Sequence, residues 1–213
     1  MAHGGGFAKG STGCEQTRFH PLARGSFGAA LVALALGGAL VAAAPVWADP
    51  VPAAAPVDPW EVALQTGWGF GITSNAQMVT FLPRVSRVLH VVPGEVPGIV
   101  SFGVEGLFSR IVETSHAMEL GGGLLLRYRW ASPRVQPYAE IGGAMLYSDL
   151  RRFHLGARAL FAAQGAVGVE LPLTHGLALT TGYRFRHISN AGQSRQNPGL
   201  NSNILVAGVA VHF

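Results

Sequence analysis

Near the end of the chain, a histidine and a serine stand two positions apart in an alternating segment. The stretch reads GYRFRHISNAG over residues 182–192, and it contains His187 and Ser189. Residues i and i+2 of a strand share one face about 6.6 Å apart, so an imidazole and a hydroxyl can lean together. A serine hydroxyl becomes a useful nucleophile when a neighbouring base takes its proton. The pair therefore has the residue types of an ester-hydrolysing site, although His-x-Ser also occurs by chance at polar strand ends.

The strand before this pair decides which way the two side chains point. One face carries Leu177, Leu179, Thr181, Tyr183 and Phe185, and the other carries Ala178, Thr180, Gly182, Arg184 and Arg186. Continuing the alternation puts His187 and Ser189 on the bulky, apolar face. What that face contacts follows from the rest of the chain.

The N-terminal region has the parts of a secretory signal. The chain has 213 residues and a formal charge of +4. Charged residues make up 12% of it, and 29 residues are glycine. Arginines precede an apolar run over 28–44, and small residues lead to a predicted cleavage after Ala48, with a retained membrane anchor as the alternative. Residues 1–48 are therefore predicted as a signal peptide and 49–59 as a Pro/Ala-rich linker. The single cysteine, Cys14, lies in the leader, so the mature chain offers no disulfide or thiolate chemistry.

Residues 60–213 alternate with the period of strands rather than of helices. Turn signals divide this region into eight segments. They are 60–72, 77–91, 99–110, 116–130, 136–147, 158–172, 177–189 and 202–213.

The two faces of these segments favour a small closed barrel in a membrane. One face is bulky and apolar, while the other is largely glycine and alanine with isolated charges of both signs, which suits a cramped lumen. Closure leaves no unpaired strand edge in lipid. We therefore predict an all-β, eight-stranded antiparallel transmembrane β-barrel of the bacterial outer membrane. Short turns at one end and longer loops at the other place the end of the seventh strand near the external leaflet.

The motif residues resemble a known family. HISNAG, followed by NPGLN, is similar to the signature of PagL-type lipid A 3-O-deacylases, also called acyloxyacyl hydrolases. The resemblance covers the last third of the chain by motif and the rest by architecture. It implies hydrolysis of the 3-O-linked acyl ester of lipopolysaccharide, with Ser189 as nucleophile and His187 as general base. It also implies that Asn190 forms or orients the oxyanion site and that catalysis uses no cofactor. The histidines are scattered over different elements without metal-ligand spacing.

The chain departs from the family pattern at the acidic member of the triad. The resemblance places a glutamate at the start of the last strand, where this chain has Asn201. An amide can hold an imidazole by a hydrogen bond, but it cannot stabilise the imidazolium as a carboxylate does. Asn201 is thus a possible third member, and a helper from another strand stays open. Glu119, Glu140 and Glu170 are predicted to face the lumen, where they can pair with Arg127, Arg129, Arg184 and Arg186.

The partners expected from the sequence are those of an outer-membrane enzyme. Arg151, Arg152 and Arg195 lie in external loops, where they are candidate contacts for lipid A phosphates or simply solvated charges. The terminal Phe213 resembles the assembly signal of outer-membrane proteins. A clustered basic surface for nucleic acid is absent from the sequence, and dimer formation stays open. The alternative function is a non-catalytic barrel with a structural or adhesion role.

Overall fold

The computed structural model describes residue 1 and residues 57–72, 76–112, 117–149, 155–174, 176–195 and 197–213. Within these residues the chain forms eight strands. They are β1 (Trp60–Gly71), β2 (Gln77–Val92), β3 (Gly98–Ile111), β4 (Met118–Trp130), β5 (Gln136–Ser148), β6 (Ala159–Thr174), β7 (Leu177–Ser189) and β8 (Leu200–His212). In the same ranges, no helix is long and apolar enough to cross a membrane. The predicted signal peptide and most of the predicted linker lie outside the described residues and stay predictions.

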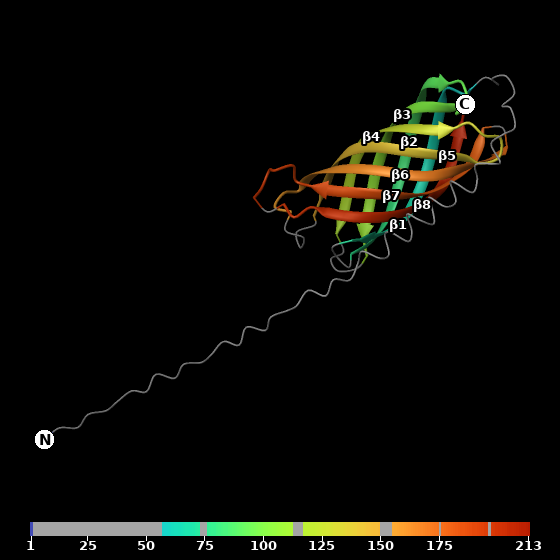
Figure 1. Cartoon of the computed structure of the whole chain (residues 1–213). Helices are drawn as coiled ribbons and strands as arrows, with labels where there is room; N and C mark the ends of the chain where they lie inside the picture. Colours follow the sequence, from blue (N-terminus) through green and yellow to red (C-terminus); the bar gives the residue numbers. More distant parts are fainter. Residues whose placement is uncertain (2–56, 73–75, 113–116, 150–154, 175, 196) are drawn as a thin grey trace. The chain divides into compact units, whose positions relative to one another are not determined.

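The strands close into a barrel in which each strand pairs antiparallel with its two neighbours (Figure 1). Closure is made by β1 and β8, whose register runs from Glu61 opposite His212 to Gly71 opposite Ser202. At one end, the Trp60 amide donates to the Phe213 carbonyl at 3.0 Å, so the first and last strands meet there. The connections after β2, β4 and β6 lie at that same end, while the two longest connections, after β5 and β7, lie at the other. The predicted eight-stranded antiparallel barrel is confirmed, and each strand bound lies within two residues of its predicted position.

The outer wall is apolar along its length, as the alternation predicts. Along β7, the outward residues Leu177, Leu179 and Phe185 are exposed, while Arg184 and Arg186 are buried. β1 behaves in the same way, because every second residue from Trp60 onward is exposed and the residues between are buried. A continuous band of exposed apolar side chains is unfavourable in water and is the usual exterior of an outer-membrane barrel.

The lumen is filled by ion pairs. The inward charged residues of the described strands include Arg84, Arg127, Arg129, Arg184 and Arg186 together with Glu61, Glu105, Glu119, Glu140 and Glu170. Arg84 contacts Glu140 at 2.6 Å and Glu61 at 2.8 Å, and it links strands on opposite sides of the barrel. The predicted pairing of inward charges across the lumen is confirmed. The alternating pattern did not identify Glu61, Arg84 and Glu105 as part of this network.

The lumen network leaves little room for chemistry inside the barrel. Arg84, Arg127, Arg184 and Arg186 are among the largest fully buried side chains, and an eight-stranded barrel has an interior only wide enough for such groups. Each guanidinium is matched by carboxylates, which avoids an uncompensated buried charge. Any reaction with a lipid substrate must therefore use the outer wall or the loops.

We predict that breaking one lumen pair destabilises the barrel strongly. Both terminal guanidinium nitrogens of Arg184 contact Glu105, one of them at 2.9 Å, and Glu105 is 1% exposed. Glu105→Gln should lower the free energy of unfolding by about 3–5 kcal/mol, because a buried guanidinium loses its main counter-charge. The measurement is denaturant unfolding in detergent micelles. Arg110→Gln, on the exposed face of the same strand, should change stability by about 0.5 kcal/mol or less. Equal stability of the two variants would contradict this prediction.

Candidate active site on the outer wall

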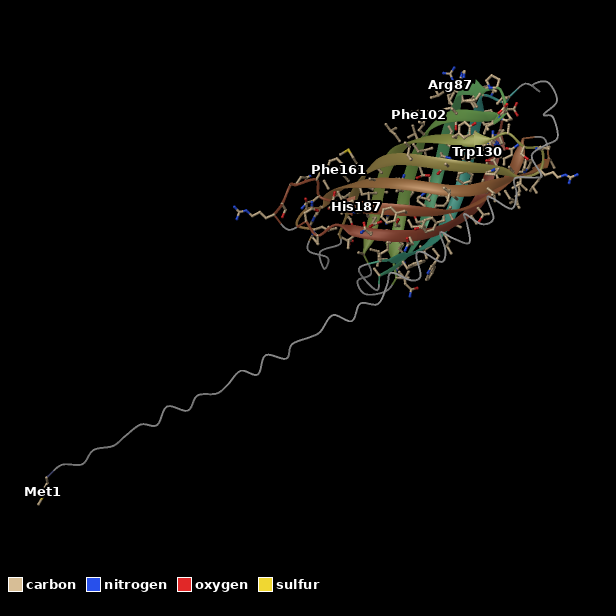
Figure 2. All side chains as sticks on the ribbon, viewed as in Figure 1. Met1, Arg87, Phe102, Trp130, Phe161 and His187 are labelled. Carbon is tan, nitrogen blue, oxygen red and sulfur yellow. The ribbon has the colours of Figure 1, made fainter. Side chains whose placement is uncertain are left out.

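His187 and Ser189 end β7 on the outward face. Their neighbours Arg186 and Ile188 are buried in the lumen, while both site residues are partly exposed. Figure 2 shows His187 and Phe161 toward the end of the barrel that carries the β5–β6 and β7–β8 loops, and Arg87 and Trp130 toward the opposite end. The pair thus lies on the apolar wall, close to one rim of the barrel.

The imidazole of His187 is held by the neighbouring strand. Asn201 of β8 lies in register with His187, and the two side chains meet at 2.7 Å between Nδ1 and Oδ1. An amide oxygen only accepts hydrogen bonds, so the ring nitrogen Nδ1 carries the proton and donates it. The second nitrogen, Nε2, is then left with its lone pair. This is the tautomer that a general base needs.

Gly199 makes room for the ring. A Cβ at this position would lie 2.7 Å from Cε1 of His187, which is closer than side-chain atoms approach. Its φ of +66° is a left-handed conformation that favours glycine. Where the chain enters β8, the backbone of Gly199 therefore packs against the imidazole. Asn201 follows two residues after Gly199.

Ser189 is placed beside His187 without being bonded to it in this structure. It lies in register with Phe161 of β6, and Oγ makes no hydrogen bond to any residue of the described ranges. Among the described residues no acceptor fixes the hydroxyl, so it can rotate about χ1. The spacing brings both groups to one face, and the structure joins His187 to Asn201 rather than to Ser189.

Asn190 organises the loop after β7. Its side chain is fully buried, and Nδ2 donates to the carbonyls of Leu155 at 2.7 Å and Ser194 at 3.4 Å. Its Oδ1 accepts the Gly192 amide at 2.9 Å. The side chain thus ties the β7–β8 loop to the β5–β6 loop, and both of its amide hydrogens have carbonyl acceptors.

A groove on the outer wall begins at His187. It has a volume of about 510 Å³ and crosses from β7 to β3. Its lining is Phe102, Leu124, Leu125, Leu126, Ile141, Gly142, Ala163, Gln164, Phe185 and His187. The Gln164 side chain turns toward the lumen, where it contacts Glu105 and Arg184, both at 3.4 Å. Among the lining side chains that point outward, His187 is therefore the polar one, and it lies at one end of an otherwise apolar groove.

Comparison with known proteins identifies the family at this point. The family model for lipid A 3-O-deacylase (PagL) matches residues 95–210, which is more than half of the chain and includes the site. The chain belongs to the PagL family. A search of curated proteins found no match.

Solved structures related to this PagL-family chain share its barrel. The crystal structure of the outer membrane enzyme PagL has a TM-score of 0.55 at 18% identity, covering 72% of this chain and 99% of that chain. The crystal structure of Neisserial surface protein A (NspA) has a TM-score of 0.51 at 19% identity, covering 72% and 97% respectively. At these identities the likeness shows the fold, which is that of outer-membrane barrels.

The other predicted site residues are distributed as follows. Arg195 is exposed in the β7–β8 loop, while Arg151 and Arg152 lie outside the described residues. Glu119 and Glu140 face the lumen, so neither reaches the outer wall. Neither the role of Gly199 nor the groove follows from the sequence pattern of any single strand. The sequence did contain a signal for the groove. Several outward positions of β5 and β6 carry glycine or alanine, whereas the outward positions of the other strands mostly carry bulky apolar side chains.

One inward cluster has the residue types of a metal site. Glu61, Glu170 and His212 place possible ligand atoms within 4.8 Å of one another. Arg127 contacts both carboxylates, at 3.0 Å and 3.1 Å, and Arg129 contacts Glu170. Two guanidinium groups already neutralise these carboxylates, and their charge repels a cation. The cluster is better described as part of the lumen ion-pair network.

We predict that His187 in detergent micelles is the tautomer protonated at Nδ1. Asn201→Leu should convert it to a mixture of tautomers, because the acceptor for the Nδ1 proton is lost. Nitrogen-15 NMR of the histidine rings measures this directly. Asn203→Leu, two residues further along β8, removes an amide that accepts from the Tyr183 hydroxyl rather than from His187 and should leave the His187 signals in place. Protonation at Nε2 in the native protein would contradict the hydrogen-bond direction described here.

Proposed function

We propose that this chain is an outer-membrane lipid A 3-O-deacylase in which Ser189 is the nucleophile and His187 is the general base. The observation that carries the proposal is the His187–Asn201 hydrogen bond at the mouth of an apolar groove on the outer wall. This hydrogen bond orients Nε2 of His187 on the same face as the Ser189 hydroxyl. An acyl ester of a membrane lipid can reach both groups there. Membership of the PagL family supports the same ester as substrate.

The reaction follows from these positions. Nε2 of His187 takes the Ser189 proton as Oγ attacks the ester carbonyl carbon, and a tetrahedral intermediate forms. The intermediate collapses when the bond to the sugar 3-oxygen breaks, and His187 returns the proton to that oxygen. Water then attacks the acyl-Ser189 ester, with His187 again as base, and the fatty acid leaves. Hydrogen bonds at a base and nucleophile are often long without substrate, which fits the unbonded Ser189 hydroxyl.

The remaining residues have supporting roles. Asn201 fixes the tautomer of His187 in place of the family's glutamate. Asn190 orients the loop after the nucleophile, because its amide hydrogens are engaged by backbone carbonyls. The Ala191 amide makes no hydrogen bond within the described residues and is a candidate oxyanion donor. Arg151, Arg152 and Arg195 are proposed to meet lipid A phosphates at the external rim.

The location of the protein completes the proposal. A leader over 1–48 directs export, the terminal aromatic Phe213 serves the outer-membrane assembly machinery, and the β7–β8 loop faces the cell exterior. A dimer is compatible with these roles but is not required by the site. The substrate is then lipopolysaccharide of the outer leaflet.

We predict that the native chain removes one ester-linked acyl chain from lipid A in cells. Ser189→Ala and His187→Asn should each reduce this activity by at least about 10³-fold, because the nucleophile or its base is lost. Mass spectrometry of extracted lipid A measures the change. Thr181→Val, which removes a hydroxyl from the same face of the same strand, should retain activity. Deacylation that persists in Ser189→Ala would refute the assigned nucleophile, and unmodified lipid A with the native chain would favour a structural or adhesion role.

A second prediction concerns the neutral partner of His187. Asn201→Leu should lower kcat/KM about 10- to 100-fold, because the imidazole loses its orientation. Asn201→Glu should raise kcat/KM above the native value, because a carboxylate stabilises the imidazolium formed in the transition state. Ester hydrolysis in mixed micelles, with kcat and KM separated, provides the measurement. Equal rates for the native chain and Asn201→Leu would remove Asn201 from the site.

A further inference from the structure

We propose that Gly143, Ala163 and Gly165 form the floor of a track that sets the length of the acyl chain released at Ser189. The inference rests on the proposed function and adds the determinant of acyl-chain length. By the alternation of their strands, Gly143 lies on the outward face of β5, and Ala163 and Gly165 lie on that of β6. Ala163 lines the groove itself, while Gly143 and Gly165 directly follow its lining residues Gly142 and Gln164. We call them the small-residue floor.

Strand register connects the small-residue floor to the candidate base. One row of outward residues runs His187, Ala163, Gly143, Leu124. The next row runs Phe185, Gly165, Ile141, Leu126, Phe102. The floor residues therefore lie between bulky side chains at both ends of each row, and His187 stands at one end.

Internal packing does not require glycine at two of these positions. A Cβ at Gly143 or at Gly165 would meet its nearest neighbour at 3.7 Å, an ordinary contact. The adjacent inward residue differs, because a Cβ at Gly142 would lie 2.6 Å from the Leu124 carbonyl. Gly142 is thus needed by the barrel, whereas Gly143 and Gly165 only leave the outer wall hollow. A hollow in a wall otherwise lined by leucine and phenylalanine suits an occupant from outside.

The dimensions of the groove fit a straight saturated chain. It extends from His187 on β7 to Phe102 on β3, which is four strand spacings of about 4.8 Å, or roughly 19 Å. A fully extended backbone advances about 3.6 Å over three bonds, so a chain of about 14 to 16 carbons has the same length. No charged side chain lines the groove. An acyl group with its carbonyl at His187 therefore has its methyl end near Leu124 and Phe102.

Three variants test the small-residue floor with saturated esters of graded chain length in mixed micelles. For the native chain, kcat/KM should rise with length up to about 14 carbons. Gly143 lies two strand spacings from His187, so Gly143→Leu should move the optimum to about 6–8 carbons and lower kcat/KM for the longest ester by more than about 10-fold. The shortest ester should be hydrolysed at the native rate. Leu124→Ala opens the far end and should move the optimum to longer chains.

Ala207→Leu is the matched control for added bulk on the wall. Ala207 is exposed on β8, a strand that contributes no residue to the groove lining, so this variant should keep the native length profile. An unchanged length profile in Gly143→Leu would overturn the inference. A uniform loss of activity for all esters in Gly143→Leu, together with an unshifted optimum in Leu124→Ala, would overturn it as well. If the native chain hydrolyses no ester of any length, the proposed function itself fails, which is a different result.

Discussion

Closing eight strands into a barrel leaves an interior that side chains must fill, and this constraint decides where chemistry can occur. The interior here is occupied by guanidinium and carboxylate groups such as Arg84 and Glu140, which meet at 2.6 Å. Such pairs mainly compensate one another, because removing charges from water costs about as much as their attraction returns. Because these pairs occupy the interior, the inner face has no space left for a substrate. The outer wall and the loops are the surfaces that remain available to a substrate, and the wall is the apolar one, which suits a substrate held in the membrane.

The site on that wall is assembled from both sides of one hairpin. β7 supplies His187 and Ser189, and β8 supplies Asn201 and the close approach of Gly199. Asn190 fixes the loop between the strands by bonding across to Leu155. The proposed base and nucleophile therefore lie at strand ends, while the loop between the strands is held by a buried side chain. This is the kind of support that keeps a base and a nucleophile in productive positions.

A neutral partner for His187 has a physical rationale on a lipid-facing wall. An isolated carboxylate beside a neutral imidazole would carry an uncompensated charge in a medium of low polarity. An amide fixes the ring tautomer without that cost. The consequence is weaker stabilisation of the imidazolium during catalysis. In the proposed mechanism, Asn201 therefore gives less stabilisation of the transition state than a carboxylate would, but it keeps the ground state free of an uncompensated charge.

The sequence predicted the strands because their signal is local. Period-two alternation on β7 and turn residues around it define both the strand and the outward direction of His187. The lumen partners of Arg84 were harder to predict, because Glu61 and Glu140 come from distant strands. The groove was not predictable from single segments, since Ala163 and Phe102 come to line one groove only through the register of β3, β4, β5 and β6. The bond from Asn190 to Leu155 joins two loops that sequence spacing does not relate.

The central claim is that Ser189 is activated by His187 on the membrane-facing side of the wall. Labelling the protein in lipid vesicles with a long-chain alkyl fluorophosphonate, followed by peptide mass spectrometry, tests it directly. The account predicts a single adduct on Ser189 that disappears in His187→Asn. An adduct on another residue, or labelling of Ser189 that does not depend on His187, would contradict it.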